Sequence, residues 1–209
     1  MSDDHDHDDH ARAENTRRVG VLTALLEQRG IVSERELDDM VEAFVARTGP
    51  AQGARIVARA WTDTGFRARL LEDANAAVRE LGLDMASGTA PHLRLRAVEN
   101  TPELHNVVVC TLCSCYPVAI LGPPPTWYKS ESYRSRVVRD PRGVLAELGV
   151  ELDPDSRIRV WDSSAETRYL VIPRRPEGTE ELDEEELAAL VSRNALIGTA
   201  LVEPSAAAR

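Results

Sequence analysis

The three cysteines of the chain lie within six residues, at Cys110, Cys113 and Cys115. They directly follow Val107 to Val109, a β-branched run that is typical of a buried strand. Thiolates are strong, soft metal ligands, and the end of a strand is where a rigid scaffold presents reactive groups. This spacing predicts a strand that delivers a metal site, and we expect the rest of the chain to support it.

The C-x-x-C-x-C spacing argues against the commonest kinds of cysteine site. Structural zinc takes four ligands from two separated pairs, and His92 and His105 do not form a second pair. A four-cysteine iron–sulfur cluster would lack its fourth thiolate. Three cysteines cannot all pair in disulfides, so a secreted domain stabilised by disulfides is not expected either.

Main-chain nitrogens offer the missing ligands. If Cys113 and Cys115 bind one ion, the amide nitrogens of Ser114 and Cys115 lie between the two sulfurs and close small fused chelate rings. These four atoms then form a square, Cys110 binds from below, and one position stays open for a substrate. Three thiolates and two amidates carry more negative charge than a trivalent ion neutralises, which favours arginine neighbours. The alternative is a group of redox-sensitive thiols without metal.

Charge and hydropathy limit the class of protein. A net charge of −10 argues against a nucleic-acid surface, which depends on clustered Lys and Arg. No apolar run approaches the ~20 residues that span a membrane. The N-terminus is rich in Asp and His, unlike a secretory signal. We therefore expect a cytoplasmic protein, in which a reducing environment keeps the cysteines available to a metal.

Composition and periodicity divide the chain into three parts. Residues 1–10 are expected to be a disordered acidic and His-rich tail, because they are too polar to pack. Residues 11–82 have apolar residues at helical spacing and a capping box at Ser33 and Glu36, which predicts a helical arm. Residues 83–209 are expected to form the metal-binding domain.

That domain is predicted to mix strands and helices. A turn at residues 162–165 should join two of the strands, and the prolines after the cysteines should stiffen the backbone. Strands are expected near residues 93–97, 106–109, 158–160 and 169–171, with a last edge strand at 197–202. Helices are expected at residues 127–139 and 141–149, and from a capping box at Asp183 and Glu186.

The segment from Val109 to Pro117, Val-Cys-Thr-Leu-Cys-Ser-Cys-Tyr-Pro, resembles the metal-binding signature of nitrile hydratase α subunits and of the related subunit of thiocyanate hydrolase. The resemblance runs from about Gly49 to about Gly198. Its other matching segments are residues 60–63, 133–139, 160–164 and 175–179. The resemblance implies an α+β fold with an N-terminal helical arm and a layered α/β/β/α metal-binding domain.

The resemblance also implies a role for each cysteine. Cys110, Cys113 and Cys115 would bind the metal together with the amide nitrogens of Ser114 and Cys115. Cys113 would be oxidised to a sulfinic acid and Cys115 to a sulfenic acid. The oxidised sulfur of Cys115 would serve as nucleophile or base, with Ser114 as a secondary catalytic contact.

Other residues near the signature indicate the metal and the surroundings of the site. Thr111 and Tyr116 resemble the cobalt-binding class, which implies non-corrin Co(III) in preference to iron. Tyr116 and Val118 are expected in the substrate pocket, where that class usually has Trp in place of Val118, so we expect a roomier pocket. The residues expected to surround the metal ligands are Thr111, Arg134, Arg136, Asp162, Ser163 and Glu166.

The activity implied by the resemblance is the hydration of a small nitrile to its amide. The implied partners are a β subunit, possibly split into two chains, in a heterotetramer of two αβ pairs, and a cobalt-inserting activator protein. No nucleic-acid or membrane partner is expected. One alternative is the metal-bearing subunit of thiocyanate hydrolase, and another is a non-catalytic metal-binding or redox subunit.

Overall fold

The computed structural model describes residues 3–47, 49–83, 85, 93–113 and 115–204, with the backbone alone at 3–13, 34 and 43–47. The chain forms two compact units, Met1–Arg47 and Thr48–Arg209. None of the helices in the described part is both long and apolar enough to cross a membrane.

The first unit consists of helix α1 (Asp3–Gln28) and helix α2 (Glu34–Arg47). Helix α1 includes residues 3–10, so these residues are helical where an irregular tail was expected. The predicted capping box before α2 is present: the Ser33 amide donates to the Glu36 carboxylate at 2.8 Å, and the Glu36 amide donates to the Ser33 hydroxyl at 3.2 Å. The two helices expose apolar side chains at Val19, Val21, Leu22, Leu25, Met40 and Val41.

The second unit contains two parallel pairs of strands. Strand β1 (Arg94–Glu99) pairs with β4 (Thr167–Ile172), and β2 (Leu104–Val109) pairs with β3 (Arg157–Asp162). The turn expected at residues 162–165 therefore connects strands of different sheets, and β3 and β4 do not form a hairpin. The Ser163 main-chain amide still donates to the Val109 carbonyl of the β2–β3 sheet at 2.7 Å. The Glu166 carbonyl, three residues later, accepts from the Arg94 main-chain amide of the β1–β4 sheet at 2.7 Å. The chain changes sheet between these two bonds.

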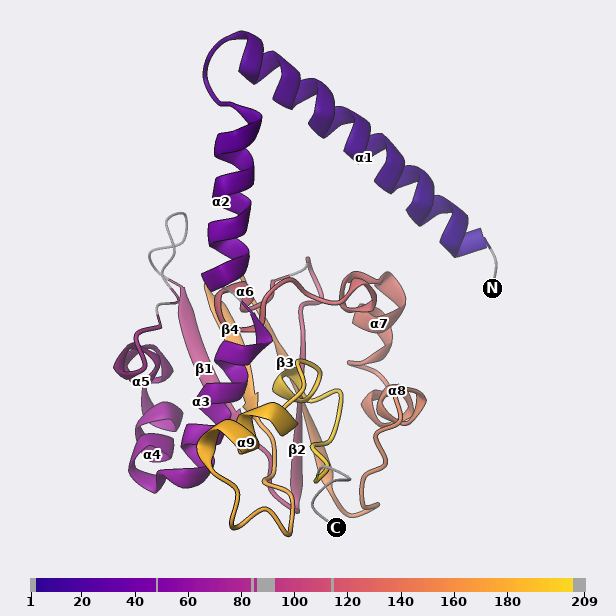
Figure 1. Cartoon of the computed structure of the whole chain (residues 1–209). Coiled ribbons are helices and arrows are strands. Elements are labelled where there is room, and N and C mark those ends of the chain that lie inside the picture. Colours follow the sequence, from indigo (N-terminus) through magenta and orange to yellow (C-terminus); the bar gives the residue numbers. More distant parts are fainter. Residues whose placement is uncertain (1–2, 48, 84, 86–92, 114, 205–209) are drawn as a thin grey trace. The chain divides into compact units, whose positions relative to one another are not determined.

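Helices cover the outer sides of the two sheets, as Figure 1 shows. Helices α4 (Thr64–Glu72) and α5 (Ala74–Glu80) contact β1, and α3 (Pro50–Thr62) contacts β4 and α9 (Glu184–Leu190). On the other side, α8 (Pro141–Glu147) contacts β3 and α7 (Glu131–Arg136). This arrangement agrees with the layered α/β/β/α architecture that was expected.

Helices α3 to α5 belong to the second unit, although the helical arm was expected to continue to residue 82. Asp63 and Asp73 cap α4 and α5 by accepting hydrogen bonds from Phe66 N at 2.9 Å and Ala76 N at 3.0 Å. The apolar faces of these helices are buried, at Ile56, Val57, Phe66, Leu70 and Val78. Burial against the sheet, which periodicity does not reveal, sets the boundary between the units.

Three expected elements take another form. Residues 127–139 do not form one helix, because the 3₁₀ helix η1 (Thr126–Lys129) ends at Ser130, whose hydroxyl accepts from Tyr133 N to begin α7. Helix α6 (Val118–Leu121) lies within the proline-rich stretch. The last expected strand is replaced by the 3₁₀ helix η2 (Ala195–Ile197), which ends at Gly198 with φ 78°.

Buried polar groups hold the beginning of β2. The His105 Nε2 donates to the Gly198 carbonyl at 2.8 Å, and its Nδ1 lies 3.2 Å from the Asn100 amide. The Asn106 side chain donates to Glu99 O at 2.7 Å and accepts from Trp161 Nε1 at 2.8 Å. Burial lowers the pKa of His105, so the ring is neutral at pH 7. This network fixes the strand that leads to the cysteines.

Candidate metal centre

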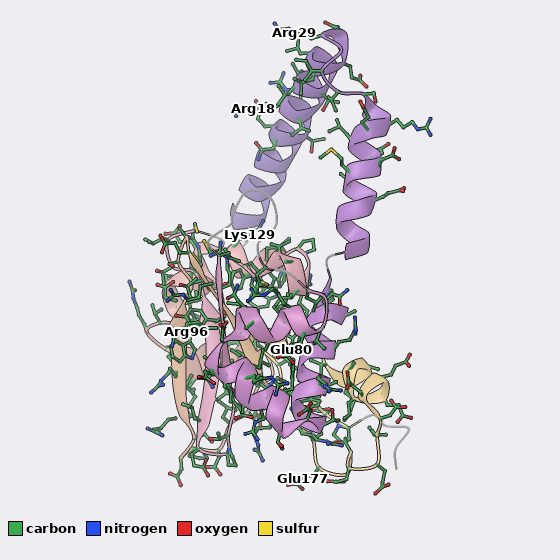
Figure 2. The ribbon with its side chains drawn as sticks, turned by 90° about the vertical axis from the view of Figure 1, so that its left-hand side faces the viewer. Arg18, Arg29, Glu80, Arg96, Lys129 and Glu177 are labelled. Atoms are coloured by element: carbon green, nitrogen blue, oxygen red, sulfur yellow. The ribbon has the colours of Figure 1, made fainter. Side chains whose placement is uncertain are left out.

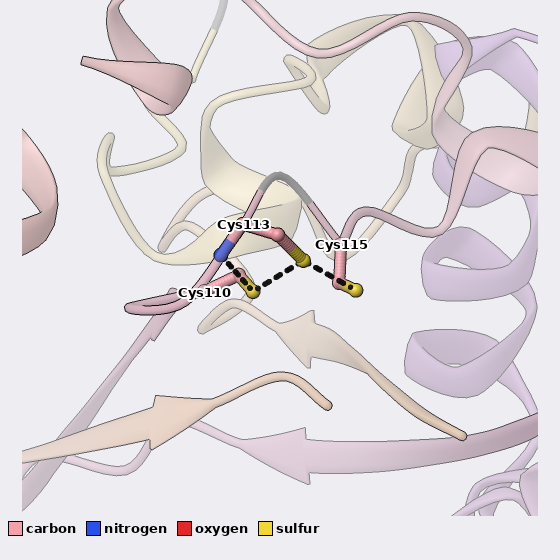
Figure 3. Close-up of side chains that lie close together, drawn as sticks. All are labelled: Cys110, Cys113 and Cys115. Atoms are coloured by element: carbon pink, nitrogen blue, oxygen red, sulfur yellow. Dashed lines mark hydrogen bonds between the residues drawn. The ribbon is translucent and has the colours of Figure 1, made fainter. Parts of the chain in front are cut away.

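The sulfur atoms of the three cysteines converge at the end of β2. Cys110 directly follows the strand and is buried, Cys115 is half-buried and Cys113 is exposed. The Cys113 Sγ lies 3.2 Å from the Cys110 Sγ and 3.0 Å from the Cys115 Sγ (Figure 3). All three sulfurs lie within 4.8 Å of one another. The strand end therefore brings the three predicted ligands to one point.

These separations fit three ligands of a single metal ion. Two sulfurs at a right angle, each at a bond length of about 2.3 Å, lie about 3.2 Å apart, whereas tetrahedral angles place them about 3.8 Å apart. The observed separations are 3.2 and 3.0 Å. These sulfur–sulfur separations thus favour an ion with square or octahedral coordination over tetrahedral zinc.

The electrostatics of the cluster also fit a bound cation. Burial, followed by the contact with Cys113, raises the pKa of the Cys115 thiol to about 12, although the Arg168 guanidinium acts in the opposite direction. Neighbouring thiolates repel one another, so the cluster cannot ionise fully by itself. A metal ion replaces the thiol protons and supplies the missing positive charge.

Ser114 lies outside the described residues. The predicted ligation by its amide nitrogen, and by that of Cys115, therefore stays a prediction. Before it in the loop, the Cys113 amide donates to the Cys110 Sγ at 3.3 Å.

Asp162 and Arg134 hold the first half of the cysteine loop. The Asp162 carboxylate accepts from the Thr111 amide at 2.9 Å and from the Thr111 hydroxyl at 2.5 Å. The Arg134 guanidinium donates to the Thr111 carbonyl at 3.2 Å. All three were expected around the metal ligands, and the structure brings them together on one residue of the loop.

Arg168 holds the second half of the loop and was missed in the sequence. Its Nε donates to the Tyr116 carbonyl at 3.3 Å, and its Nη1 donates to the carbonyls of Ser164 and Ala165. Arg168 lies on the same face of β4 as Leu170 and Ile172, which are buried. An arginine on the inward face of a strand was the signal that could have identified it.

Tyrosine hydroxyls form a second set of supports that the sequence analysis did not single out. Tyr128 donates to the Cys115 carbonyl at 3.1 Å, and Tyr133 donates to the Val108 carbonyl at 2.8 Å. The Tyr116 ring packs edge-on against Tyr128, with centroids 5.0 Å apart. Burial raises the pKa of all three phenols, so they remain protonated, and Tyr128 and Tyr133 can donate. The density of tyrosine and tryptophan between residues 116 and 133 was the available signal.

Two buried polar atoms near the loop have no hydrogen-bond partner among the described residues: Tyr116 Oη and Arg134 Nε. Ser163 is buried beside Tyr128, and Val118, half-buried, begins α6 directly after the loop. Buried polar groups usually have partners. Their concentration here indicates that this end of the domain is built to meet another group.

Two expected residues lie elsewhere. Arg136 forms an ion pair with Glu147 on the exposed surface of α7 and α8. Glu166 is exposed, and the hydrogen bonds described for it use its main chain, to Arg94 N and the Ser164 hydroxyl. Among the described contacts, neither side chain reaches the cysteines.

Comparison with known proteins gives consistent matches. The profile of the family described as nitrile hydratase, alpha chain, matches residues 13–200. The low-molecular weight cobalt-containing nitrile hydratase subunit alpha of Rhodococcus rhodochrous is 52% identical over 184 residues, which are 88% of this chain and 87% of the relative. The thiocyanate hydrolase subunit gamma of Thiobacillus thioparus is 45% identical over 168 residues, which are 77% and 69%.

Solved structures agree with the sequence matches. A double mutant of Fe-type nitrile hydratase from Comamonas testosteroni Ni1 superposes with a TM-score of 0.84 at 43% identity, over 91% of each chain. This similarity supports the expected fold.

Proposed function

This chain belongs to the nitrile hydratase α-chain family, and from that premise we propose that it is the metal-bearing α subunit of a cobalt nitrile hydratase. The reaction adds water across the carbon–nitrogen triple bond of a nitrile and gives the amide. The observation that carries the proposal is the convergence of three sulfurs at the end of β2, with separations of 3.2 and 3.0 Å.

Cys110, Cys113 and Cys115 would hold the ion, and the amide nitrogens of Ser114 and Cys115 would complete its ligands. Bound Co(III) supplies Lewis acidity, which polarises the nitrile or lowers the pKa of water. Cobalt is preferred because the Rhodococcus relative is named as cobalt-containing and because Thr111 resembles that class. Iron is the second choice, since an Fe-type structure is also similar.

Within the loop, we assign the chemistry to Cys115. With Cys113 as a sulfinic acid and Cys115 as a sulfenic acid, the Cys115 oxygen would serve as nucleophile or accept a proton from water. Tyr128 donates to the Cys115 carbonyl, and Arg168 donates to the next carbonyl, that of Tyr116, so this half of the loop has little freedom to move. Ser114 would make a secondary contact.

Asp162 acts as a positioning residue for the other half of the loop. Its carboxylate binds both the amide and the hydroxyl of Thr111, between Cys110 and Cys113. Groups that orient metal ligands in this way tune metal affinity and activity.

The exposed tip of the cysteine loop is evidence for a partner chain. Leu112 is 90% exposed although it lies beside the ligands Cys110 and Cys113. An apolar residue at such a place is suited to burial by another chain. We assign that chain as the β subunit and the assembly as a heterotetramer of two αβ pairs. A separate activator protein would insert cobalt in the cytoplasm.

Metal analysis and mass spectrometry of the copurified αβ complex test this function. We expect stoichiometric cobalt, and a tryptic loop peptide with two oxygens on Cys113 and one on Cys115. The complex should hydrate acrylonitrile. Three unmodified thiols with labile zinc would instead indicate the non-catalytic binder and overturn the proposal.

Thiocyanate hydrolase is the second candidate, because its gamma subunit from Thiobacillus thioparus is 45% identical to this chain. An anionic substrate favours a positively charged channel, and Val118 supplies no charge there. Assaying the same complex with thiocyanate and with a nitrile separates the two activities. Production of carbonyl sulfide without amide formation would decide for thiocyanate.

Val118 should influence which nitriles the pocket accepts. The side chain is half-buried directly after the cysteine loop, where a larger residue would fill space. We expect Val118→Trp to lower kcat/KM for benzonitrile relative to acrylonitrile by about tenfold, because a bulky ring loses room. Val118→Ile is the matched control and should leave the ratio within about twofold. An unchanged ratio in Val118→Trp would exclude Val118 from the pocket.

A further inference from the structure

Four exposed arginines lie on two strands of the second unit. Arg94 and Arg96 project from β1, and Arg157 and Arg159 project from β3. Within the described part of the chain, none of the four forms an ion pair or a side-chain hydrogen bond. By contrast, Arg59, Arg67, Arg69 and Arg136 each pair with a carboxylate. Acidic residues outnumber Lys and Arg in this chain, 35 to 25, so a group of four arginines that form no ion pair in its described part needs an explanation.

One arginine of each pair lies over the same indole ring. The Trp161 centroid lies 5.4 Å from the Arg159 guanidinium carbon and 6.0 Å from that of Arg96. The Trp161 ring also packs on Tyr169, with centroids 5.1 Å apart. Because Trp161 Nε1 donates to the buried Asn106, the ring is held in place. We refer to Arg94, Arg96, Arg157, Arg159, Trp161 and Tyr169 as the arginine face.

Strand register explains why these residues share a surface. Arg96 lies opposite Tyr169 in the β1–β4 pair, and Arg157, Arg159 and Trp161 alternate along one side of β3. The contact between Trp161 and Tyr169 joins the two sheets. Figure 2 shows Arg96 over the strands rather than over the helices α3 to α5. The arginine face is therefore a rigid surface carried by strands of both sheets.

The chemistry of this surface fits carboxylates. A guanidinium that stacks on an aromatic ring keeps its planar N–H donors free at its edge, where they match a carboxylate in bidentate fashion. Stacking also limits side-chain motion, so less entropy is lost on binding. Arg, Trp and Tyr are the residues that most often contribute strongly to protein interfaces.

The arginine face adjoins the supports of the cysteine loop. Trp161 directly precedes Asp162, which binds Thr111, and Tyr169 directly follows Arg168, which binds the Tyr116 carbonyl. A chain that binds here therefore contacts β3 and β4, the strands that carry the two residues holding the loop.

We propose that the arginine face binds an acidic segment of the β subunit and orients that subunit over the metal centre. The inference rests on the proposed function for the identity of the partner, and charge complementarity identifies the kind of segment. Glu and Asp side chains of that segment would bind Arg96 and Arg159 across the Trp161 ring.

Dissociation of the purified αβ complex on dilution, followed by native mass spectrometry, tests the proposal. We expect Arg96→Glu/Arg159→Glu to weaken the αβ affinity by about 100-fold, because charge reversal replaces attraction with repulsion. Wild-type affinity should fall as salt rises to about 0.5 M, and that dependence should be smaller in the variant. Arg96→Lys/Arg159→Lys, which keeps the charge but loses the planar donors, should weaken binding by about tenfold.

Arg79→Glu on α5 is the matched control and should bind within about twofold of wild type. Near-ultraviolet circular dichroism of the Trp161 environment excludes misfolding as the cause. A photoreactive benzoylphenylalanine at position 157 should crosslink to an acidic β-subunit peptide, whereas the same probe at position 79 should not.

Unchanged affinity in the double Glu variant, or a crosslinked peptide without Asp or Glu, would overturn the proposal. Tight binding of a fluorescent oligonucleotide by wild type, lost in the double variant, would assign the face to nucleic acid instead. The proposed function is judged separately by amide formation in the wild-type complex, so an inactive complex with an arginine-dependent interface would reject the activity and keep the interface.

Discussion

The two ends of strand β2 differ in how completely the chain satisfies its own polar groups. At the beginning, both ring nitrogens of His105 and the side chain of Asn106 have partners within the chain. At the end, the buried Tyr116 Oη and Arg134 Nε around the cysteine loop are without partners among the described residues. The Cys115 pKa is raised to about 12 there, chiefly by burial.

This difference separates the part of the strand that stabilises the domain from the part that carries chemistry. A fully paired buried network gives one rigid arrangement, whereas unpaired buried groups cost free energy unless another group meets them. The beginning of β2 therefore serves stability, and its end is arranged for a metal and a partner chain. Substitutions at the two ends should accordingly affect different measurements.

The largest effect is expected at the cysteine end. Cys113→Ala removes the sulfur that lies between the other two, so cobalt should be lost and nitrile hydration should fall by at least about a thousandfold. Cobalt content and kcat/KM of the αβ complex measure this. Leu112→Ala, in the same loop, should retain cobalt. Turnover by a cobalt-loaded Cys113→Ala variant would refute the proposed ligand set.

Gly198→Ala should have the largest effect at the other end. A Cβ at Gly198 would lie 1.8 Å from the Asn106 carbonyl oxygen, and its φ of 78° is unfavourable for alanine. We expect the free energy of unfolding to fall by about 3 kcal/mol or more. Urea denaturation measures it. Gly20→Ala in α1, with no atom within 4 Å, should not destabilise the protein. Stability equal to wild type would show that η2 can move away from β2.

A smaller effect is expected for Asp162→Asn, which keeps the size of the side chain but loses the charge that binds Thr111. Activity should fall by about 10- to 100-fold, together with cobalt affinity, while the free energy of unfolding changes little. Steady-state kinetics measure the activity, and competition with a chelator measures the cobalt affinity. Asp140→Asn, at the cap of α8, is the control. Loss of stability without loss of activity would assign Asp162 to folding alone.

The smallest effect concerns pH and the beginning of β2. Burial lowers the pKa of His105 below its ordinary value near 6.5, so the folded state binds fewer protons than the unfolded state. Stability should therefore fall as the pH drops below about 6.5, and His105→Gln should show a shallower fall. Urea titrations between about pH 7.5 and 5.5 test this. Equal slopes in both proteins would exclude His105 as the titrating group.

Local sequence rules predicted some features well. The capping box at Asp183 and Glu186 begins α9 as expected, and the valines before Cys110 form β2. The rules failed where distant segments meet. Whether Arg134 or Arg136 reaches the loop depends on the helix break at Ser130 and on Glu147, which pairs with Arg136. Neither feature is encoded by spacing within one helix.

By itself, the sequence determined the nature of the site, because the three ligands lie within six residues and their spacing alone limits the geometry of a bound ion. The tertiary structure decided what surrounds it. Asp162, Arg168 and Tyr128 reach the loop only because two parallel sheets and the chain after α6 converge there. Contacts between residues distant in sequence depend on strand register and burial, which hydrophobic periodicity does not specify.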